Sequence, residues 1–146
     1  MTRYLLSLAV FFAGVVLAIF LSGGAIWPYI DIPSLLIVGV VPFIFVSILF
    51  GFKNMASVFS VPFKNEATED KLKTALAFFR VYGKTVWLAG IISVLIGAVA
   101  ILAFVEDKTR LGPNFAIVLI SLLYSAIINL TVVLPYTVLI KKRMKE

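Results

Sequence analysis

Residues 110–135 read RLGPNFAIVLISLLYSAIINLTVVLP, and this stretch sets the class of the fold. After Arg110 it contains no charged side chain, and it exceeds the roughly 20 apolar residues that a helix needs to cross a bilayer. It also carries the polar residues Asn114, Ser121, Tyr124, Ser125, Asn129 and Thr131. Lipid offers such groups no hydrogen-bonding partner. We therefore expect a membrane-spanning helix whose polar groups face other protein segments.

The composition of the whole chain is that of a membrane protein. Its 146 residues are 62% hydrophobic and 14% charged, with a mean hydropathy of +1.13. Strands of a transmembrane barrel alternate apolar and polar residues, and the sequence does not show this alternation. The sequence therefore predicts one all-α membrane domain of four transmembrane helices, of which the third and fourth are long. Their expected ranges are 4–22, 34–52, 85–105 and 113–140.

The first apolar stretch has a second interpretation. It could be a cleaved signal peptide, with Arg3 as the positive region and Ala25 near the cleavage site. Its apolar run is long for that role, so we expect a retained span.

The basic residues predict the orientation in the membrane. Arg3 precedes the first span, six basic residues lie in the connection 53–84, and four lie in the C-terminal tail. These are eleven of the thirteen basic residues, and only Lys108 and Arg110 lie in the other connections. Basic residues favour the cytoplasmic side, so both termini and the connection 53–84 are expected to be cytoplasmic. The net charge of +6 is then explained by basic residues that face anionic lipid at the cytoplasmic surface, and no sequence feature indicates nucleic-acid binding.

The chain lacks the side chains that most catalytic and cofactor sites require. It has no cysteine and no histidine, which excludes thiolate sites, histidine-ligated haem and Ser-His or Cys-His nucleophiles. We expect neither an enzyme nor a cofactor or metal site. No Asp, Glu, Lys or Arg lies within the four apolar spans. Transporters that move protons by themselves use an intramembrane carboxylate, so here another chain would have to supply it.

The cytoplasmic connection divides into two parts. Residues 53–65, KNMASVFSVPFKN, are expected to form a loop broken by Pro62. From Thr68 the pattern changes to a helix that should run unbroken into the third span, with Gly83 as its weak point.

Small and polar residues recur at helical spacing on the last two spans. Ser121, Ser125 and Asn129 share one stripe of the fourth span. The third span has a face of small residues formed by Gly90, Ser93, Gly97 and Ala100. Two explanations remain open: close packing of helices, or the lining of a partner helix and a hydrated ion path.

Two prolines lie inside predicted spans. Pro42 in the second span and Pro135 in the fourth each remove a backbone donor and should kink their helices. The kinks could provide curvature for packing or a hinge for gating.

The stretch GAVAILAFVEDKTRLGPNFAIVLISLLYSAIINLTVVLP, residues 97–135, resembles the third and fourth spans of the MotA/TolQ/ExbB proton-channel family. It is nearest the MotA and PomA flagellar-stator branch. The matching positions are Gly97, the turn 106–110, Leu111, Gly112, Pro113, Ala116, Leu119, Ser121, Tyr124, Ser125, Asn129 and Pro135. Upstream, GGAIWPYIDIPSLLIVG is similar to the outer turn and second span of that branch, at Gly23, Gly24, Asp31, Ser34, Ile37 and Val38. The resemblance covers spans two to four.

The resemblance implies a ring, typically of five copies, in the bacterial inner membrane. The ring would enclose two single-span partners of MotB or ExbD type, and an Asp of the partner would accept the ion. Spans three and four would face that partner, with Ser93 and Ser121 near the path. The positions that it implies for the ion path or the partner contact are Ser93, Gly97, Ser121, Ser125 and Asn129.

The chain also departs from the branch. Val94 and Leu122 occupy positions where the branch commonly has threonines near the partner Asp, and the hydroxyls here lie one residue earlier. The proline usual at the inner start of span three is replaced near Trp87. The cytoplasmic region is much shorter, so the torque-bearing charges of the branch have no counterparts here.

Three functions follow from these observations. We expect the ring subunit of an ion-driven membrane motor, which forms a proton or sodium path with its single-span partner and couples it to mechanical work. The alternative is a non-conducting structural or assembly protein that keeps the ring fold, which Val94 and Leu122 favour. A small exporter that works alone is disfavoured, because the spans carry no charge.

Overall fold

The computed structural model describes residues 2–52, 55–64, 67–103 and 108–145. The chain divides into two compact units, Met1–Asp31 and Ile32–Glu146. Every regular element in the described ranges is helical. Two acidic residues of the predicted outer turn, Glu106 and Asp107, lie outside these ranges.

The first unit contains the helix α1, Thr2–Leu21, and a short 3-10 turn, Trp27–Tyr29. The backbone reverses after α1 at Gly23, whose φ of 68° is a conformation that glycine adopts without strain. The described apolar part of α1, Leu6–Leu21, is shorter than the three long apolar helices of the chain. The helix predicted for the first span is therefore present, whereas its crossing of the membrane stays a prediction.

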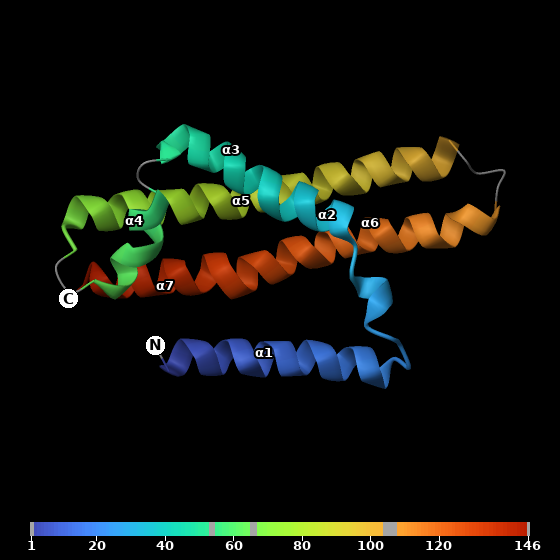
Figure 1. Ribbon diagram of the computed structural model, residues 1–146, viewed down its shortest axis with the longest axis horizontal. Coiled ribbons are helices and arrows are strands. Elements are labelled where there is room, and N and C mark those ends of the chain that lie inside the picture. The colour runs from blue at the N-terminus through green and yellow to red at the C-terminus, as the bar shows by residue number, and fades with distance from the viewer. Residues whose placement is uncertain (1, 53–54, 65–66, 104–107, 146) are drawn as a thin grey trace. The chain divides into compact units, whose positions relative to one another are not determined.

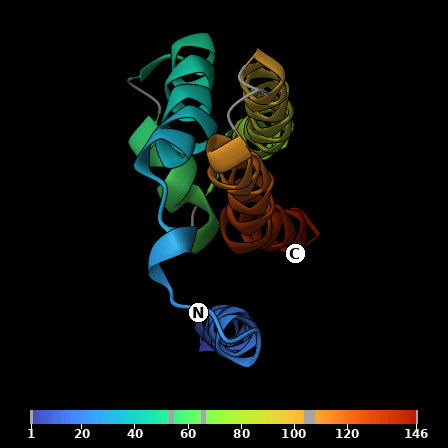
Figure 2. The ribbon, with the colours of Figure 1, turned by 90° about the vertical axis from the view of Figure 1, so that its right-hand side faces the viewer.

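The second unit is a bundle of three long helices. The first is formed by α2, a π-helical turn and α3; the second is α5; the third is formed by α6, another π-helical turn and α7. Figure 1 shows α5 antiparallel to α6 and α7, with α2 and α3 crossing them, and Figure 2 shows these three rods end-on. The bounds are Ile32–Leu35 for α2, Val41–Phe50 for α3, Glu69–Ala103 for α5, Lys108–Ile128 for α6 and Leu134–Arg143 for α7.

Three helices are long and apolar enough to cross a membrane: Trp27–Phe50, Glu69–Ala103 and Leu111–Arg143. The prediction of an all-α, multi-pass membrane protein is therefore confirmed. The four-span topology, the cytoplasmic termini and the ring remain predictions.

The helix predicted to run from the connection into the third span is confirmed. α5 contains 35 residues, which corresponds to about 52 Å of continuous helix. Glu69 and Asp70 lie in its first turn, where negative charge stabilises the positive end of the helix dipole. Glu69 also pairs with Lys73 one turn later, at an Nζ–Oε1 distance of 2.7 Å.

The prediction that residues 53–65 form a loop is wrong. The described part contains a helix, α4, at Met55–Ser60 and a 3-10 turn at Val61–Phe63. Pro62 lies at the start of that turn, where its missing N–H leaves no hydrogen bond unmade. Val58 and Val61 are buried in the core of the bundle. Burial of these apolar side chains gives the segment a fixed structure that its composition did not indicate.

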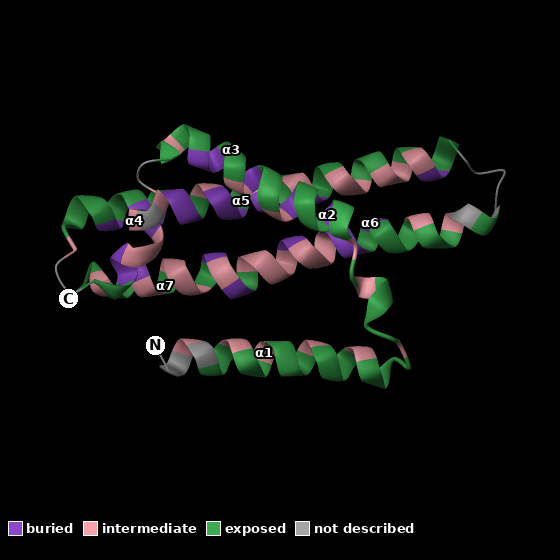
Figure 3. Cartoon of the chain, in the orientation of Figure 1, coloured by how far each residue is buried: buried purple, intermediate pink, exposed green. Residues whose placement is uncertain are grey.

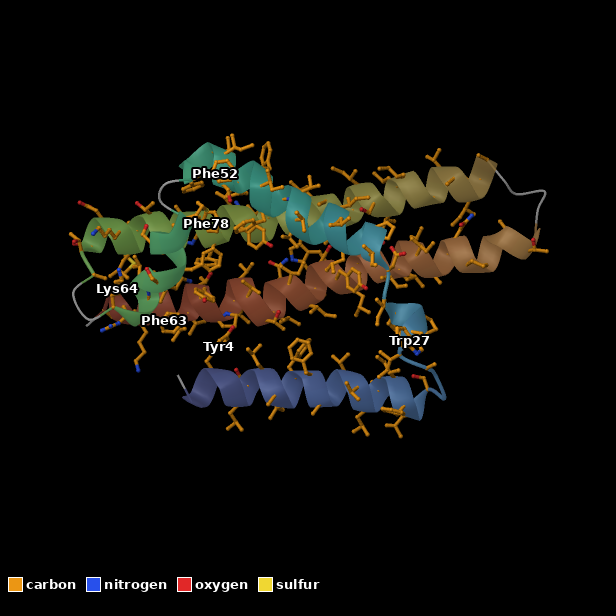
Figure 4. The ribbon with its side chains drawn as sticks, viewed as in Figure 1. Tyr4, Trp27, Phe52, Phe63, Lys64 and Phe78 are labelled. Carbon is orange, nitrogen blue, oxygen red and sulfur yellow. The ribbon has the colours of Figure 1, made fainter. Side chains whose placement is uncertain are left out.

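The core of the second unit is rich in aromatic side chains. Buried residues gather where α3, α4, α5 and α7 meet (Figure 3). Phe78 and Phe79 of α5 are fully buried, and the ring of Phe59 from α4 meets both of them edge to face. Phe63, labelled in Figure 4, meets the ring of Tyr136 edge to face and extends the cluster into the connection between α3 and α5. The connection and the long helices therefore share one core.

Arg143 at the end of α7 holds this connection. Its Nη2 donates to the carbonyl oxygen of Lys64 at 2.8 Å, and its Nε to that of Pro62 at 3.4 Å. We expect Arg143→Ala to increase the rate of tryptic cleavage after Lys64 about fivefold, because hydrogen bonds of this kind contribute about 1 kcal/mol. Gel analysis of limited proteolysis measures this rate. The control is Lys142→Ala, and equal rates for both variants would contradict the prediction.

An irregular helical turn precedes each of the two prolines for which a kink is predicted. A π-helical turn at Leu36–Val40 precedes Pro42, and another at Asn129–Val133 precedes Pro135. In each turn a backbone N–H donates to the carbonyl five residues earlier, from Val41 to Leu36 and from Leu134 to Asn129. The Tyr82 hydroxyl donates to the Gly39 carbonyl in the first turn, at 3.4 Å. The backbone is therefore irregular just before each proline, while the predicted kinks and a hinge at these positions stay predictions.

Candidate functional site

Three glycines form a straight seam along α5. Gly83, Gly90 and Gly97 are seven residues apart, and seven residues make almost two helical turns. They therefore lie on one face of the helix. We call this face the glycine seam.

Each glycine of the seam is in close contact with the third rod of the bundle. A Cβ atom at Gly90 would overlap the hydroxyl of Ser125, and one at Gly97 would overlap the Val118 side chain. At Gly83 a Cβ would lie 2.8 Å from both Oδ1 of Asn129 and Cγ1 of Val133. α5 continues through Gly83, where the glycine permits a tight contact, and its role as a weak point of the helix stays a prediction. Such close approach is how helices gain contact in lipid, where the hydrophobic effect does not drive them together.

The polar stripe of the fourth span faces protein within the same chain. The Ser121 hydroxyl donates to Ser34 of α2 at an Oγ–Oγ distance of 3.0 Å. The Ser125 hydroxyl lies 3.3 Å from the Val86 carbonyl of α5 and 3.0 Å from the Ser121 carbonyl. Nδ2 of Asn129 donates to the Ser125 carbonyl at 2.9 Å. The stripe therefore supplies the hydrogen bonds that hold three helices together.

Ser121 and Ser125 are almost inaccessible in the single chain. Ser121 is 2% exposed and Ser125 is 0% exposed. Asn129 is partly exposed and also lines an open groove between α5 and the third rod. The structure thus accounts for this stripe by helix packing, and the role of its residues in an ion path or a partner contact stays a prediction.

Ser93 differs from the other serines of the bundle. Its Oγ is buried and has no hydrogen-bond partner in the part of the chain that the structure describes. A buried hydroxyl without a partner costs free energy, particularly in lipid. Val94 and Leu122, the positions that depart from the resembling family, are both half-buried and apolar.

The chemistry available at this site is limited to packing and hydrogen bonding. The seam and the stripe offer hydroxyls, one amide and backbone carbonyls, and none of these groups carries a charge. Hydroxyl and amide groups can assist the passage of a hydrated ion, but a charged acceptor has to come from elsewhere.

Sequence reasoning missed two partners at this site. Ser34 was noted only as part of the resemblance, and its contact with Ser121 joins residues 87 positions apart. Gly83 was placed in the cytoplasmic connection, although its spacing of seven from Gly90 was a usable signal.

Comparison with known proteins gives a local similarity. No protein-family model matches the chain. The chain is 32% identical to the chemotaxis protein PomA of Vibrio alginolyticus over 68 residues, which are 47% of this chain. The match covers 27% of the length of PomA. This multi-pass membrane protein is thus similar over half of its length to a quarter of PomA.

Proposed function

We propose that the protein is the ring subunit of an ion-driven motor in a bacterial inner membrane. Five copies would surround a single-span partner of MotB or ExbD type, and the complex would couple a proton or sodium path to mechanical work. The observation that carries the proposal is the local similarity to PomA. The antiparallel pair formed by α5 and the third rod is compatible with the two spans that face the partner in the resembling family.

The absence of charge in the spans explains the need for a partner. No Asp, Glu, Lys or Arg lies in residues 85–105 or 113–140, so these predicted spans have no carboxylate with which to accept an ion. The aspartate of the partner would supply it. Ser93 is the best candidate for a direct contact, because its buried hydroxyl has no partner among the described residues.

The other predicted positions would then act by placing the helices. Gly97 lies on the glycine seam, and Ser121 and Ser125 bond α6 to α2 and to α5. Asn129 bonds the Ser125 carbonyl within its own rod. We propose that these residues contribute to the ion path by holding α5 and α6 at a fixed distance from each other.

A second candidate is a structural or assembly protein that keeps the ring fold but does not conduct. Two observations support it. Val94 and Leu122 place apolar side chains where the resembling branch commonly has threonines. The hydroxyls of Ser121 and Ser125 are already bonded within the chain.

Native mass spectrometry of the complex, purified gently through a tag on this chain, separates the two candidates. A five-copy ring with two copies of a single-span protein that carries a membrane-embedded Asp is the result expected for the motor. A ring or a dimer without that companion would contradict the motor and favour the structural role.

We expect Ser93→Ala to reduce partner-dependent ion flux about tenfold, the effect of losing one hydrogen bond of about 1.4 kcal/mol in the path. The free energy of unfolding should change little, because the hydroxyl makes no bond among the described residues. Flux into vesicles containing the purified complex measures the first quantity, and unfolding of the chain in detergent measures the second. Ser7→Ala in α1 is the control, since it also removes a single serine hydroxyl. Unchanged flux in Ser93→Ala would exclude Ser93 from the path.

A further inference from the structure

An open groove of about 540 Å³ runs between α5 and the third rod of the bundle. Its walls combine two cations with apolar side chains, one aromatic ring, one hydroxyl and, beside Leu130, the amide of Asn129. The residues that carry the argument are Arg80 and Trp87 of α5 and Leu130, Leu134, Thr137 and Lys141 of the third rod.

The groove has a charged end and an apolar end. Along the groove in one direction, the α5 wall changes from Arg80 to Trp87. In the same direction the antiparallel rod presents Lys141, then Leu134, then Leu130. Both walls therefore change from basic to apolar in the same direction. Thr137 lies one turn from Lys141, between the cations and the apolar walls.

The charged end is strongly basic. None of the described residues that line the groove is acidic. Lys141 also lines a neighbouring open groove of about 580 Å³, together with Lys142 and Lys145. Among the described residues neither Arg80 nor Lys141 makes an ion pair, and the ion pair that is present joins Lys73 to Glu69. The groove is thus complementary to an anionic group joined to an apolar body.

We propose that this groove binds a phospholipid with an anionic headgroup. The phosphate lies between Arg80 and Lys141, where charge-assisted hydrogen bonds hold it. The Thr137 hydroxyl is placed to bond the ester region. One acyl chain follows Leu134 and Leu130 and contacts the ring of Trp87, which is 43% exposed.

The gradient of the walls favours a lipid over a protein segment. A phospholipid carries its charge at one end and its apolar chains at the other, which is the order of groups along the groove. The basic end is also the end that the positive-inside rule places at the cytoplasmic leaflet, where anionic lipids gather. This inference does not depend on the motor, since a structural protein of the same fold would have the same groove.

Fluorescence of Trp87 tests the proposal. The full chain with Trp27→Phe keeps Trp87 as its single tryptophan. It is reconstituted in phosphatidylcholine vesicles that contain a minor fraction of brominated phosphatidylglycerol or, separately, brominated phosphatidylcholine, because bromine in the acyl chain quenches a tryptophan that it touches. We expect quenching to indicate an enrichment of phosphatidylglycerol over phosphatidylcholine of about 10- to 30-fold, the ratio that two basic side chains at a membrane surface provide.

Matched variants separate a site from general surface charge. Arg80→Gln with Lys141→Gln should abolish the preference for phosphatidylglycerol. Lys64→Gln with Lys71→Gln removes the same charge from exposed positions that do not line this groove and should keep the preference. Equal quenching by the two lipids, or equal loss in the two double variants, would overturn the proposal. Absence of quenching by either lipid would also overturn it, since a protein segment would then cover Trp87.

Discussion

Replacement of Phe78 by alanine is expected to lower the free energy of unfolding by about 3–5 kcal/mol, the usual cost of removing a buried phenylalanine. Phe78 is 0% exposed. Its ring meets Phe43 and Phe50 of α3 edge to face and stacks on Tyr82 of α5, with centroids 6.0 Å apart in the stacked pair. The alanine would leave a cavity at the point where the connection, α3 and α5 share their core. The effect is therefore expected to exceed that of any other single truncation considered for this chain.

Unfolding of the purified chain in mixed micelles, titrated with a denaturing detergent, measures this loss. Phe115→Ala is the matched control, because Phe115 lies on α6 and is 58% exposed. Its truncation should cost less than about 1 kcal/mol, as is usual for exposed positions. Similar losses in the two variants would show that the aromatic cluster does not form the core of the bundle.

The second large effect is expected at the glycine seam. Gly90→Ala should destabilise the chain by about 1–3 kcal/mol, although alanine is the better helix former by nearly 1 kcal/mol. The new methyl group would overlap the Ser125 hydroxyl and would lie 3.1 Å from its Cβ. Because both helices are long and packed on other elements, they can separate only by giving up contacts along the seam.

A compensating change tests the cause of this effect. Ser125→Gly removes the two atoms that the methyl group would meet, so Gly90→Ala should cost much less in that background than in the unchanged chain. Gly112→Ala in α6 serves as control, since a Cβ there meets nothing within 4 Å and should leave stability equal or slightly raised. If Gly90→Ala costs the same with and without Ser125→Gly, the seam is not closed by these two residues.

Several features of the fold could be predicted from local patterns. The apolar runs indicated membrane helices, and three long apolar helices are present. The orientation that the basic residues indicate stays a prediction. The switch to helical spacing after Thr68 predicted α5, because an amphipathic repeat and acidic residues at a helix start act within one helix. A π-helical turn precedes each of Pro42 and Pro135, and the kinks predicted at these prolines stay predictions.

The candidate site could be predicted only in part. Helical periodicity placed Ser121, Ser125 and Asn129 on one stripe, but it could not say which surface that stripe meets. The answer is α5 and α2 of the same chain, through Val86 and Ser34.

The sequence by itself determined that this chain forms long membrane helices whose apolar spans carry no charged side chain, because hydropathy, charge and helical period act over neighbouring residues. Only the tertiary structure decided that α4 folds onto Phe78 and Phe79, that Gly83 closes on Asn129, and that the Ser93 hydroxyl is left without a partner among the described residues. These outcomes depend on contacts between segments far apart in the chain, and on which atoms fill the space between two helices. A repeat within one helix fixes which residues share a face, and the packing of the whole bundle fixes what that face touches.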